Sequence, residues 1–208
     1  MKLYFTRHGK TRWNQEHRLQ GRFGDSELLP SSFVEIEKLG CYLSDTKFHA
    51  VYSSPSLRAR KTAEGIMAKS AFPVEVAYKE DLREFGLGEL EGIKIDIAHK
   101  KYPQQMNALR NDLAKYDPSR FHGESVTSLL ERFSHVVISA VLENKTNDPL
   151  LFISHGAALS AGIRHLAGFS LAQLRKAEKL ENNTLSVLEA EAKIPPYKLI
   201  KWNDGHFL

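Results

Sequence analysis

The chain has 208 residues, of which 42% are hydrophobic and 26% charged, and its formal net charge is +4. This ordinary globular composition excludes a disordered or fibrous protein, and no run approaches the roughly 18 apolar residues that span a bilayer. The mild charge lacks the dense basic runs of nucleic-acid-binding proteins, so we expect neither a nucleic acid nor a membrane as a partner.

The first residues form a strand-like run that passes directly into Arg7-His8-Gly9, without the charged and apolar regions of a signal peptide. We therefore expect a cytoplasmic protein. The single cysteine, Cys41, excludes an internal disulfide, and its neighbours predict a helix in which it is buried. No Cys-x-x-Cys or His-Glu-x-x-His pattern occurs, so a structural zinc site is not expected.

Six short β-rich runs predict strands at residues 2–6, 50–53, 74–78, 150–154, 184–189 and 197–202. Helical patterns lie between them. One begins at Ser54-Pro55, one follows His155-Gly156, and one spans 125–144 with Ser125 as its N-cap and apolar residues at i, i+3 and i+4 spacing. The alternation predicts an α/β fold with a mostly parallel central sheet flanked by helices.

Residues 92–122 hold helical patterns broken by Pro103 and Pro118, and they contain no predicted strand. We interpret this segment as a small helical insertion that caps the active site, within one domain that spans residues 1–208. The segment includes no Arg-Arg pair, and among its basic residues Lys94, Lys100, Lys101 and Arg110 are scattered at intervals that suit a solvated face.

The end of the first predicted strand carries the first candidate site residues, Arg7-His8-Gly9. Open α/β sheets bind ligands at the carboxyl ends of their strands. His8 is a nucleophile toward phosphorus if one ring nitrogen is free and a backbone carbonyl holds the other as N–H. Arg7 offers a fork of donors for phosphoryl oxygens, and Gly9 leaves room for a phosphate near the backbone.

Two further segments repeat this layout. Arg58 lies in the first turn of a predicted helix, where free N–H groups and the dipole favour phosphate. His155 follows the apolar strand 150–154 and is expected to donate to a phosphoryl oxygen. A fourth segment, the glycine-rich loop 82–92, holds several carboxylates, one of which could protonate the leaving oxygen.

Alone, each feature is more typical of a structural role: a solvated arginine, a structural histidine, an acidic surface loop. Together, the four segments supply the parts of one phosphoryl-transfer site. At this point the sequence resembles the histidine phosphatase superfamily, the phosphoglycerate mutase-like proteins. The resemblance runs nearly from end to end, over Arg7–Asn14, Leu19–Gly21, Ser53–Pro55, Arg58-Ala59, Thr62–Glu64, Leu82–Glu84, Gly88-Glu89, Glu91-Gly92, Gly123–Ser125, Ser154–Gly156, Asn183-Thr184 and Trp202–His206.

The resemblance implies the fold described above and a role for each matching residue. His8 would be the phosphorylated nucleophile, and Glu84 the acid and base. Arg7, Arg58 and His155 would form the phosphate pocket. Substrate-binding positions would be Asn14 at the edge of that pocket, Gly21, Glu124 and Ser125. Because two arginines supply fixed positive charge, neither a metal nor a cofactor is expected.

Two positions depart from the family pattern and bear on substrate preference. Lys10 replaces the usual Glu or Gln, and the loop 21–29 is one residue longer and lacks the usual Pro and Thr. We predict a phosphatase that hydrolyses monoesters of small phosphorylated metabolites through a phosphohistidine. The alternatives are a phosphoglycerate mutase and a non-catalytic module that binds phosphorylated ligands; no particular oligomeric state is predicted.

Overall fold

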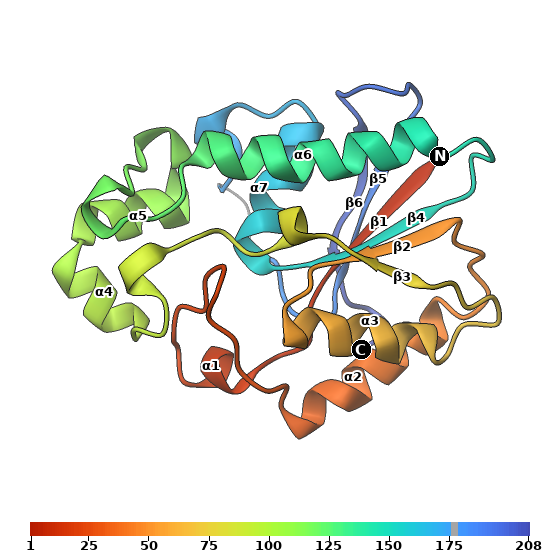
Figure 1. The fold of residues 1–208 in the computed structure, drawn as a ribbon, viewed down its shortest axis with the longest axis horizontal. Helices are drawn as coiled ribbons and strands as arrows, with labels where there is room; N and C mark the ends of the chain where they lie inside the picture. Colours follow the sequence, from red (N-terminus) through yellow and green to blue (C-terminus); the bar gives the residue numbers. More distant parts are fainter. Residues whose placement is uncertain (176–178) are drawn as a thin grey trace.

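The computed structural model describes residues 1–175 and 179–208, and one six-stranded sheet forms its centre (Figure 1). The strands lie in the order β3-β2-β4-β1-β5-β6. Parallel pairing joins β3 to β2, β2 to β4 and β4 to β1. β5 pairs antiparallel with both of its neighbours, β1 and β6. Their bounds are β1 Lys2–Arg7, β2 Ala50–Ser53, β3 Val76–Tyr78, β4 Leu150–Ser154, β5 Leu185–Glu189 and β6 Lys198–Asp204.

Helices cover both faces of this sheet (Figure 1). On one face lie α6 (Val126–Glu143) and α7 (Gly156–Leu166), and on the other α2 (Pro30–Tyr42) and α3 (Leu57–Met67). The alternation of side chains along the strands explains the two layers. In β4, Leu150 and Phe152 pack in the cluster with α6 and α7, while Leu151 and Ile153 pack with α2 and α3.

The segment 92–122 contains only helical elements and loops, at the carboxyl end of the sheet (Figure 1). It holds α4 (Ile95–Lys101), α5 (Pro103–Asn111) and the short helices η3 (Leu113–Lys115) and η4 (Ser119–Phe121). Buried Met106 and Phe121 join it to the core cluster of α6 and α7. The remaining short elements are α1 (Arg12–Gln15), η1 (Glu80–Leu82), η2 (Gly88–Leu90) and η5 (Leu171–Gln173).

The predicted fold class is confirmed: the sheet is mostly parallel, helices flank it, and a helical segment caps one end. Strand bounds differ by a few residues, and the predicted strand 74–78 is shorter because its pairing with β2 starts at Val76 opposite Val51. Ser125 does cap α6, since its hydroxyl accepts from the Ser128 N–H at 3.1 Å. In the described residues, no helix is long and apolar enough to cross a membrane.

The prediction that Cys41 is buried is wrong. The side chain is exposed. The helix α2 buries Ile36, Leu39 and Gly40, and Leu43 follows on the same side. This i, i+3, i+4, i+7 stripe faces the sheet, and position 41 falls outside it.

Candidate active site

His8 follows the last residue of β1 and is almost fully buried. Its Nδ1–H donates to the carbonyl of Gly9 at 2.7 Å, which fixes the tautomer and leaves Nε2 with its lone pair. Burial, followed by the charges of Arg58 and Arg7, holds the pKa of His8 well below its ordinary value. The imidazole is therefore neutral near pH 7, as a nucleophile toward phosphorus requires.

Arg7 extends from the end of β1 toward the start of α7. Its Nη1 donates to the carbonyl of Leu180 at 2.8 Å, whereas its buried Nε has no hydrogen-bond partner in the described residues. A Cβ on Gly156 would lie 3.1 Å from that Nε, so glycine at this position keeps the guanidinium accessible. A buried donor without a partner is costly, and a phosphoryl oxygen would satisfy it.

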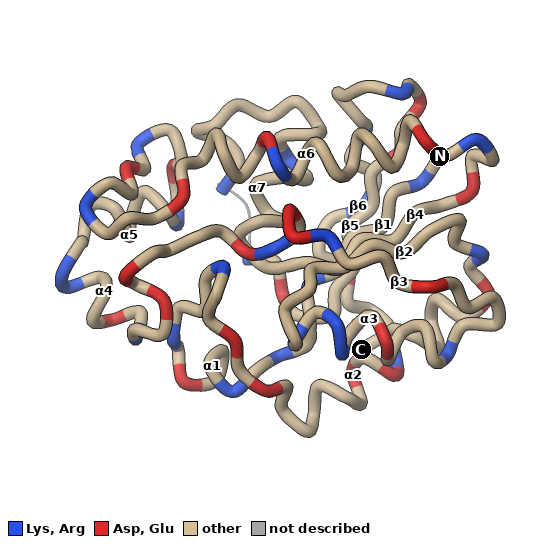
Figure 2. The backbone as a smooth tube through the Cα atoms, viewed as in Figure 1, with Lys and Arg blue, Asp and Glu red and all other residues tan. Residues whose placement is uncertain are grey.

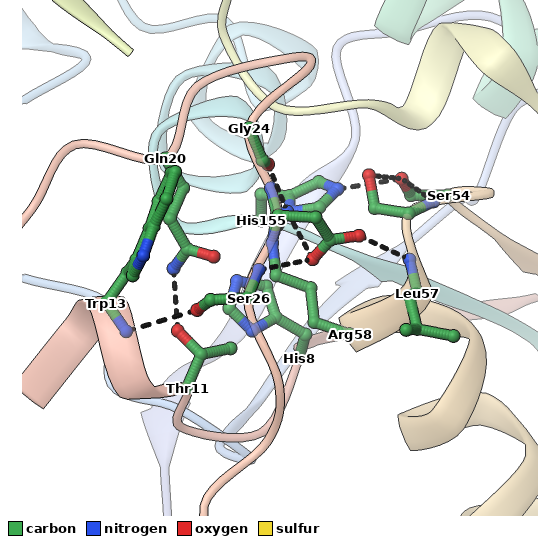
Figure 3. Close-up of polar contacts among 12 residues, drawn as sticks. His8, Thr11, Trp13, Gln20, Gly24, Ser26, Ser54, Leu57, Arg58 and His155 are labelled. Carbon is green, nitrogen blue, oxygen red and sulfur yellow. Dashed lines mark hydrogen bonds and ion pairs between the residues drawn. The ribbon is translucent and has the colours of Figure 1, made fainter. Parts of the chain in front are cut away.

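Arg58 lies in the first turn of α3, and its side chain is fully buried. The loop 21–25 folds over it: Nη1 donates to the Gly24 carbonyl at 2.7 Å and pairs with Asp25 at 2.9 Å. Nη2 donates to the carbonyl of Gly21 at 3.1 Å. Figure 3 shows this guanidinium between the Gly24 carbonyl and the rings of His8 and His155. The loop thus fixes the plane of Arg58 before any ligand arrives.

His155 follows β4 and is fully buried. Its Nδ1 accepts from Arg58 Nε at 3.2 Å, and its Nε2 lies 2.7 Å from the hydroxyl of Ser54 (Figure 3). Burial and then the charge of Arg58 hold the pKa of His155 well below its ordinary value. Both ring nitrogens are engaged within the protein in this structure, and the ring orients Arg58. The expected donation from His155 to a phosphoryl oxygen stays a prediction.

Glu84 approaches the site from the loop after η1, opposite the N-terminus of α7. Its two oxygens accept from the Ala157 and Ala158 N–H groups at 3.1 and 2.8 Å, and one also accepts from Phe85 N–H at 2.8 Å. Both Glu84 and Arg7 line the cavities described below. The carboxyl group is thus held beside the phosphate-binding residues.

Arg132 on α6 holds the Glu84 loop in place. It donates to the carbonyls of Asp81, Arg83 and Glu84 at 2.6–2.9 Å. Two further hydrogen bonds, at 2.6 and 2.8 Å, join it to the carboxylate of Glu124. Burial opposes ionisation of Glu124, but the bonds from Arg132 and the Gly86 N–H hold its pKa below the ordinary value.

In this structure the side chains of Glu124 and Ser125 contact the protein itself, and their expected substrate-binding roles stay predictions. The carboxylate of Glu124 pairs with Arg132 and Arg22 and accepts from the Gly86 N–H, and Ser125 caps α6. Neither is among the described side chains that line the cavities. Sequence position put both near the site, but their contacts are with the protein itself.

Glu91 holds the loop 21–25 in place through hydrogen bonds to its backbone, as Arg132 holds the Glu84 loop. It accepts from the backbone N–H groups of Arg22, Phe23 and Gly24 at 2.8–2.9 Å. The loop turns at Gly21 with φ +65°, and a Cβ there would lie 2.2 Å from a Glu91 oxygen. Glycine at 21 is therefore required by the approach of Glu91.

Two adjoining cavities open over these residues, and Arg7, Glu84 and Ala157 line both. The smaller, of about 200 Å³, is lined by His8 and Arg58 and also by Asn14 and Gly21, as expected for substrate-binding positions. The larger, of about 1430 Å³, extends under α4 and α5. Lys10 is exposed and lies outside the described lining of both.

The basic residues of the cap are exposed, as the predicted solvated face requires: Lys94, Lys100, Lys101 and Arg110. Lys94, Lys100 and Arg110 also line the larger cavity, whereas Lys101 does not. Among the described residues, no cluster of three His, Cys, Asp or Glu side chains could hold a metal ion; independence from metal remains a prediction.

Residues 3–204 match the family described as the histidine phosphatase superfamily (branch 1). The chain belongs to this superfamily. It is 30% identical to "Phosphoglycerate mutase-like protein 4" of Arabidopsis thaliana over 89% of this chain and 77% of that protein. It is 31% identical to "Putative phosphoserine phosphatase 2" of Hydrogenobacter thermophilus over 83% of this chain and 82% of that protein. The structure of Bacillus stearothermophilus YhfR superposes with a TM-score of 0.87 at 27% sequence identity. The superposition covers 98% of this chain and 96% of YhfR.

These findings confirm the predicted family and the prediction that the chain is a phosphoric monoester hydrolase of the histidine phosphatase type. They also fit a small phosphorylated substrate. Several residues of this histidine phosphatase were missed by the sequence reasoning: Asp25, Glu91, Arg132 and Arg175. Their contacts join segments that are distant in the sequence, and Arg132 lies beside the apolar stripe of α6 rather than within it.

Proposed function

We propose that this histidine phosphatase hydrolyses monoesters of small phosphorylated metabolites through a phosphohistidine on Nε2 of His8. The observation that carries the proposal is the ring itself: it is buried, its pKa is lowered, its Nδ1–H is bound to the Gly9 carbonyl, and His8 lines the smaller cavity with Arg7 and Arg58. The proposal treats the chain as one catalytic domain capped by residues 92–122. It places the enzyme in the cytoplasm and assigns no role to nucleic acids.

In the first step, Nε2 attacks phosphorus in line, and the ester P–O bond breaks. Arg7 and Arg58 stabilise the charge on the equatorial oxygens, because protein contacts fix the planes of both guanidinium groups beforehand. The buried Nε of Arg7 is a donor without a protein partner among the described residues. Protonated Glu84 gives its proton to the leaving oxygen. The alcohol then departs and leaves a phosphoryl group on His8.

In the second step, Glu84 takes a proton from water, and the resulting nucleophile attacks the phosphoryl group. The P–N bond breaks, His8 regains its lone pair on Nε2, and inorganic phosphate leaves. His155 has a supporting part in both steps, because it holds Arg58 through Nε. Asn14 and Gly21 are proposed to contact the bound ester from the wall of the smaller cavity.

A phosphoglycerate mutase is the second candidate. The cationic side chains of the cap that line the larger cavity support it, because the sequence alone gave no reason to place them near the site. A mutase must retain the dephosphorylated product beside phosphohistidine and exclude water. The name of the Arabidopsis relative points the same way, and that of the Hydrogenobacter relative toward a phosphatase.

Activity measurements separate these candidates. Purified protein is tested on a panel of phosphate esters with and without excess EDTA, and a coupled assay follows 2-phosphoglycerate formed from 3-phosphoglycerate. We expect phosphate release that EDTA does not abolish and little isomerisation. Isomerisation tenfold faster than phosphate release would establish the mutase, and no turnover of any ester would establish a binding module.

A further inference from the structure

Both ends of the peptide group between His8 and Gly9 are held by side chains from distant parts of the sequence. The carbonyl of His8 accepts from Asn182 Nδ2 at 2.7 Å. The N–H of Gly9 donates to the hydroxyl of Thr62 at 3.0 Å. Within a strand, such groups bond to the neighbouring strand, but β1 has ended at Arg7. Two side chains therefore support this peptide in place of the sheet.

Thr62 lies in the middle of α3 and is fully buried. Its hydroxyl hydrogen is committed, because it donates to the carbonyl of Arg58, one helical turn earlier, at 2.7 Å. A lone pair of the same oxygen is then available for the Gly9 N–H. This one hydroxyl connects the peptide of the nucleophile to the first turn of α3, which carries the phosphate-binding Arg58.

The two supporting side chains are uncharged, in contrast to the cap. In the view of Figure 2, Lys and Arg residues are spread along α4 and α5 at the cap end of the molecule. Such charges act on a ligand over many ångströms, whereas a hydrogen bond from a short side chain holds one atom in one place. The 8–9 peptide is therefore held by local geometry.

The orientation of this peptide determines the tautomer of the His8 ring. The N–H of His8 is fixed by the carbonyl of Ser154 at 3.0 Å, so the remaining backbone freedom lies after its Cα. Gly9 restricts that freedom little, because a glycine tolerates a wide range of φ and ψ. A rotation of the 8–9 peptide would carry the Gly9 carbonyl away from Nδ1, which it meets at 2.7 Å. The ring would then lose the contact that fixes its proton.

We propose that Thr62 and Asn182 are positioning residues for the phosphorylation of His8. By holding the 8–9 peptide, they keep the Gly9 carbonyl on Nδ1–H and Nε2 free and in line with the phosphorus. The inference rests on the proposed function for the identity of the nucleophile. Neither side chain is in the described lining of the two cavities, so both act through the His8 backbone. A ring with its proton on Nε2 has no lone pair there for phosphorus.

The first measurement is of the ring itself, so its result does not depend on turnover. Two-bond ¹H–¹⁵N spectra of protein with ¹⁵N-labelled histidine distinguish the two neutral tautomers, and His8→Gln identifies the His8 signals among those of the nine histidines. The wild type should hold His8 almost entirely as the Nδ1–H tautomer. Thr62→Val, which keeps the shape and removes the hydroxyl, should raise the Nε2–H form to at least about 10%. Asn182→Leu should do the same.

Single-turnover kinetics report the consequence for the reaction. Thr62→Val and Asn182→Leu should each slow phosphorylation by p-nitrophenyl phosphate about 10-fold to 100-fold, because small displacements of a reacting group cost that much. The half-saturating ester concentration should change less than about threefold, since the contacts that orient Arg7 and Arg58 remain. Thr62→Ser keeps the hydroxyl and should retain most of the rate and the wild-type tautomer.

Ser186→Ala is the matched control. The Ser186 hydroxyl accepts from the backbone N–H of Asn203, also at 3.0 Å, and the side chain is buried like that of Thr62. It lies in β5 opposite Phe5 rather than beside His8. This variant should lose stability to a similar extent as Thr62→Val, while the His8 tautomer and the phosphorylation rate stay as in the wild type.

An unchanged His8 tautomer in both variants would overturn the proposal. So would Thr62→Ser as defective as Thr62→Val, or Ser186→Ala that shifts the ring to the same extent, because either result would assign the effect to general packing. If Thr62→Val does not fold, Asn182→Leu decides, since Asn182 is only half-buried. Failure of the proposed function has a different signature: the tautomer would respond to the variants, but the wild type would form no phosphohistidine.

Discussion

Arg58 and Arg110 both line the connected cavities, yet their surroundings differ completely. Arg58 is buried, and a loop and a histidine satisfy its donors before substrate binds. Arg110 is exposed and has no carboxylate partner in the described part of the chain. Protein contacts hold the positive charge of Arg58 in one geometry in the phosphate pocket, whereas Arg110 on the cap wall of the larger cavity is not held in this way. We infer that the pocket is specific for one phosphoryl geometry and that the cap wall tolerates variation in the rest of the ligand.

The pocket should therefore be intolerant of change at its centre. We expect His8→Ala to lower turnover of every ester about 10³-fold or more, because no other nitrogen can take its place in line with the phosphorus. Steady-state phosphate release measures the loss. His135→Ala, an exposed histidine on α6, is the control and should be silent. Retention of more than a few per cent of activity in the His8 variant would place the nucleophile elsewhere.

The next largest effect should depend on the leaving group. Glu84→Gln should slow phosphorylation by alkyl phosphates about 10²-fold to 10⁴-fold, because an alkoxide leaves poorly without a proton. The same change should affect p-nitrophenyl phosphate much less. Single-turnover rates on the two ester types give the ratio.

Glu89→Gln is the matched control for this ratio, since Glu89 is half exposed and lies 3.6 Å from His122 rather than on the cavity wall. Equal losses on both ester types in the Glu84 variant would mean that its carboxyl group is structural. A large loss in the Glu89 variant instead would identify that residue as the acid.

The support behind the pocket should appear in stability as well as in rate. Arg132→Met removes three backbone contacts and leaves the buried Glu124 without its main partner, which should lower the free energy of unfolding by about 3–5 kcal/mol. Urea denaturation measures this, with the exposed neighbour Glu131→Gln as control. The double variant with Glu124→Gln should recover part of the loss. A change below about 1 kcal/mol would contradict the assigned network.

Acid should destabilise the pocket through its histidines. His8 and His155 have folded pKa values well below the unfolded value of about 6.5, so below that pH the unfolded chain binds protons that the native state does not. Stability should thus fall as the pH is lowered, by up to about 1.4 kcal/mol per pH unit for each histidine. In urea titrations His8→Gln should remove about half of this slope. An unchanged slope would mean that the pKa of His8 is the same in the folded and unfolded states, which would contradict the buried, neutral ring.

The sequence was sufficient to predict the site residues that lie at the ends of strands. The placement of Arg7 and His8 at the end of β1 follows from an apolar run that stops at a glycine, and the same pattern places His155 after β4. The N-cap contact of Ser125 was also predictable, because it is local. The contacts of His155 and Glu124 were not, because their partners are distant in the sequence. Arg175 and Arg110 are 65 positions apart, and they reach one wall of the larger cavity because η3 packs against both α5 and η5.

The most direct test of the account is the position of the phosphoryl group on the enzyme. Rapid acid-free quenching during ester turnover, followed by ³¹P NMR and peptide mapping, reports both the residue and the ring nitrogen. We predict one phosphoryl group on Nε2 of His8, because Nδ1–H is committed to the Gly9 carbonyl. The group should be absent in His8→Ala and should accumulate in Glu84→Gln supplied with p-nitrophenyl phosphate. A phosphoryl group on Nδ1, on another residue, or on none during active turnover would contradict the account.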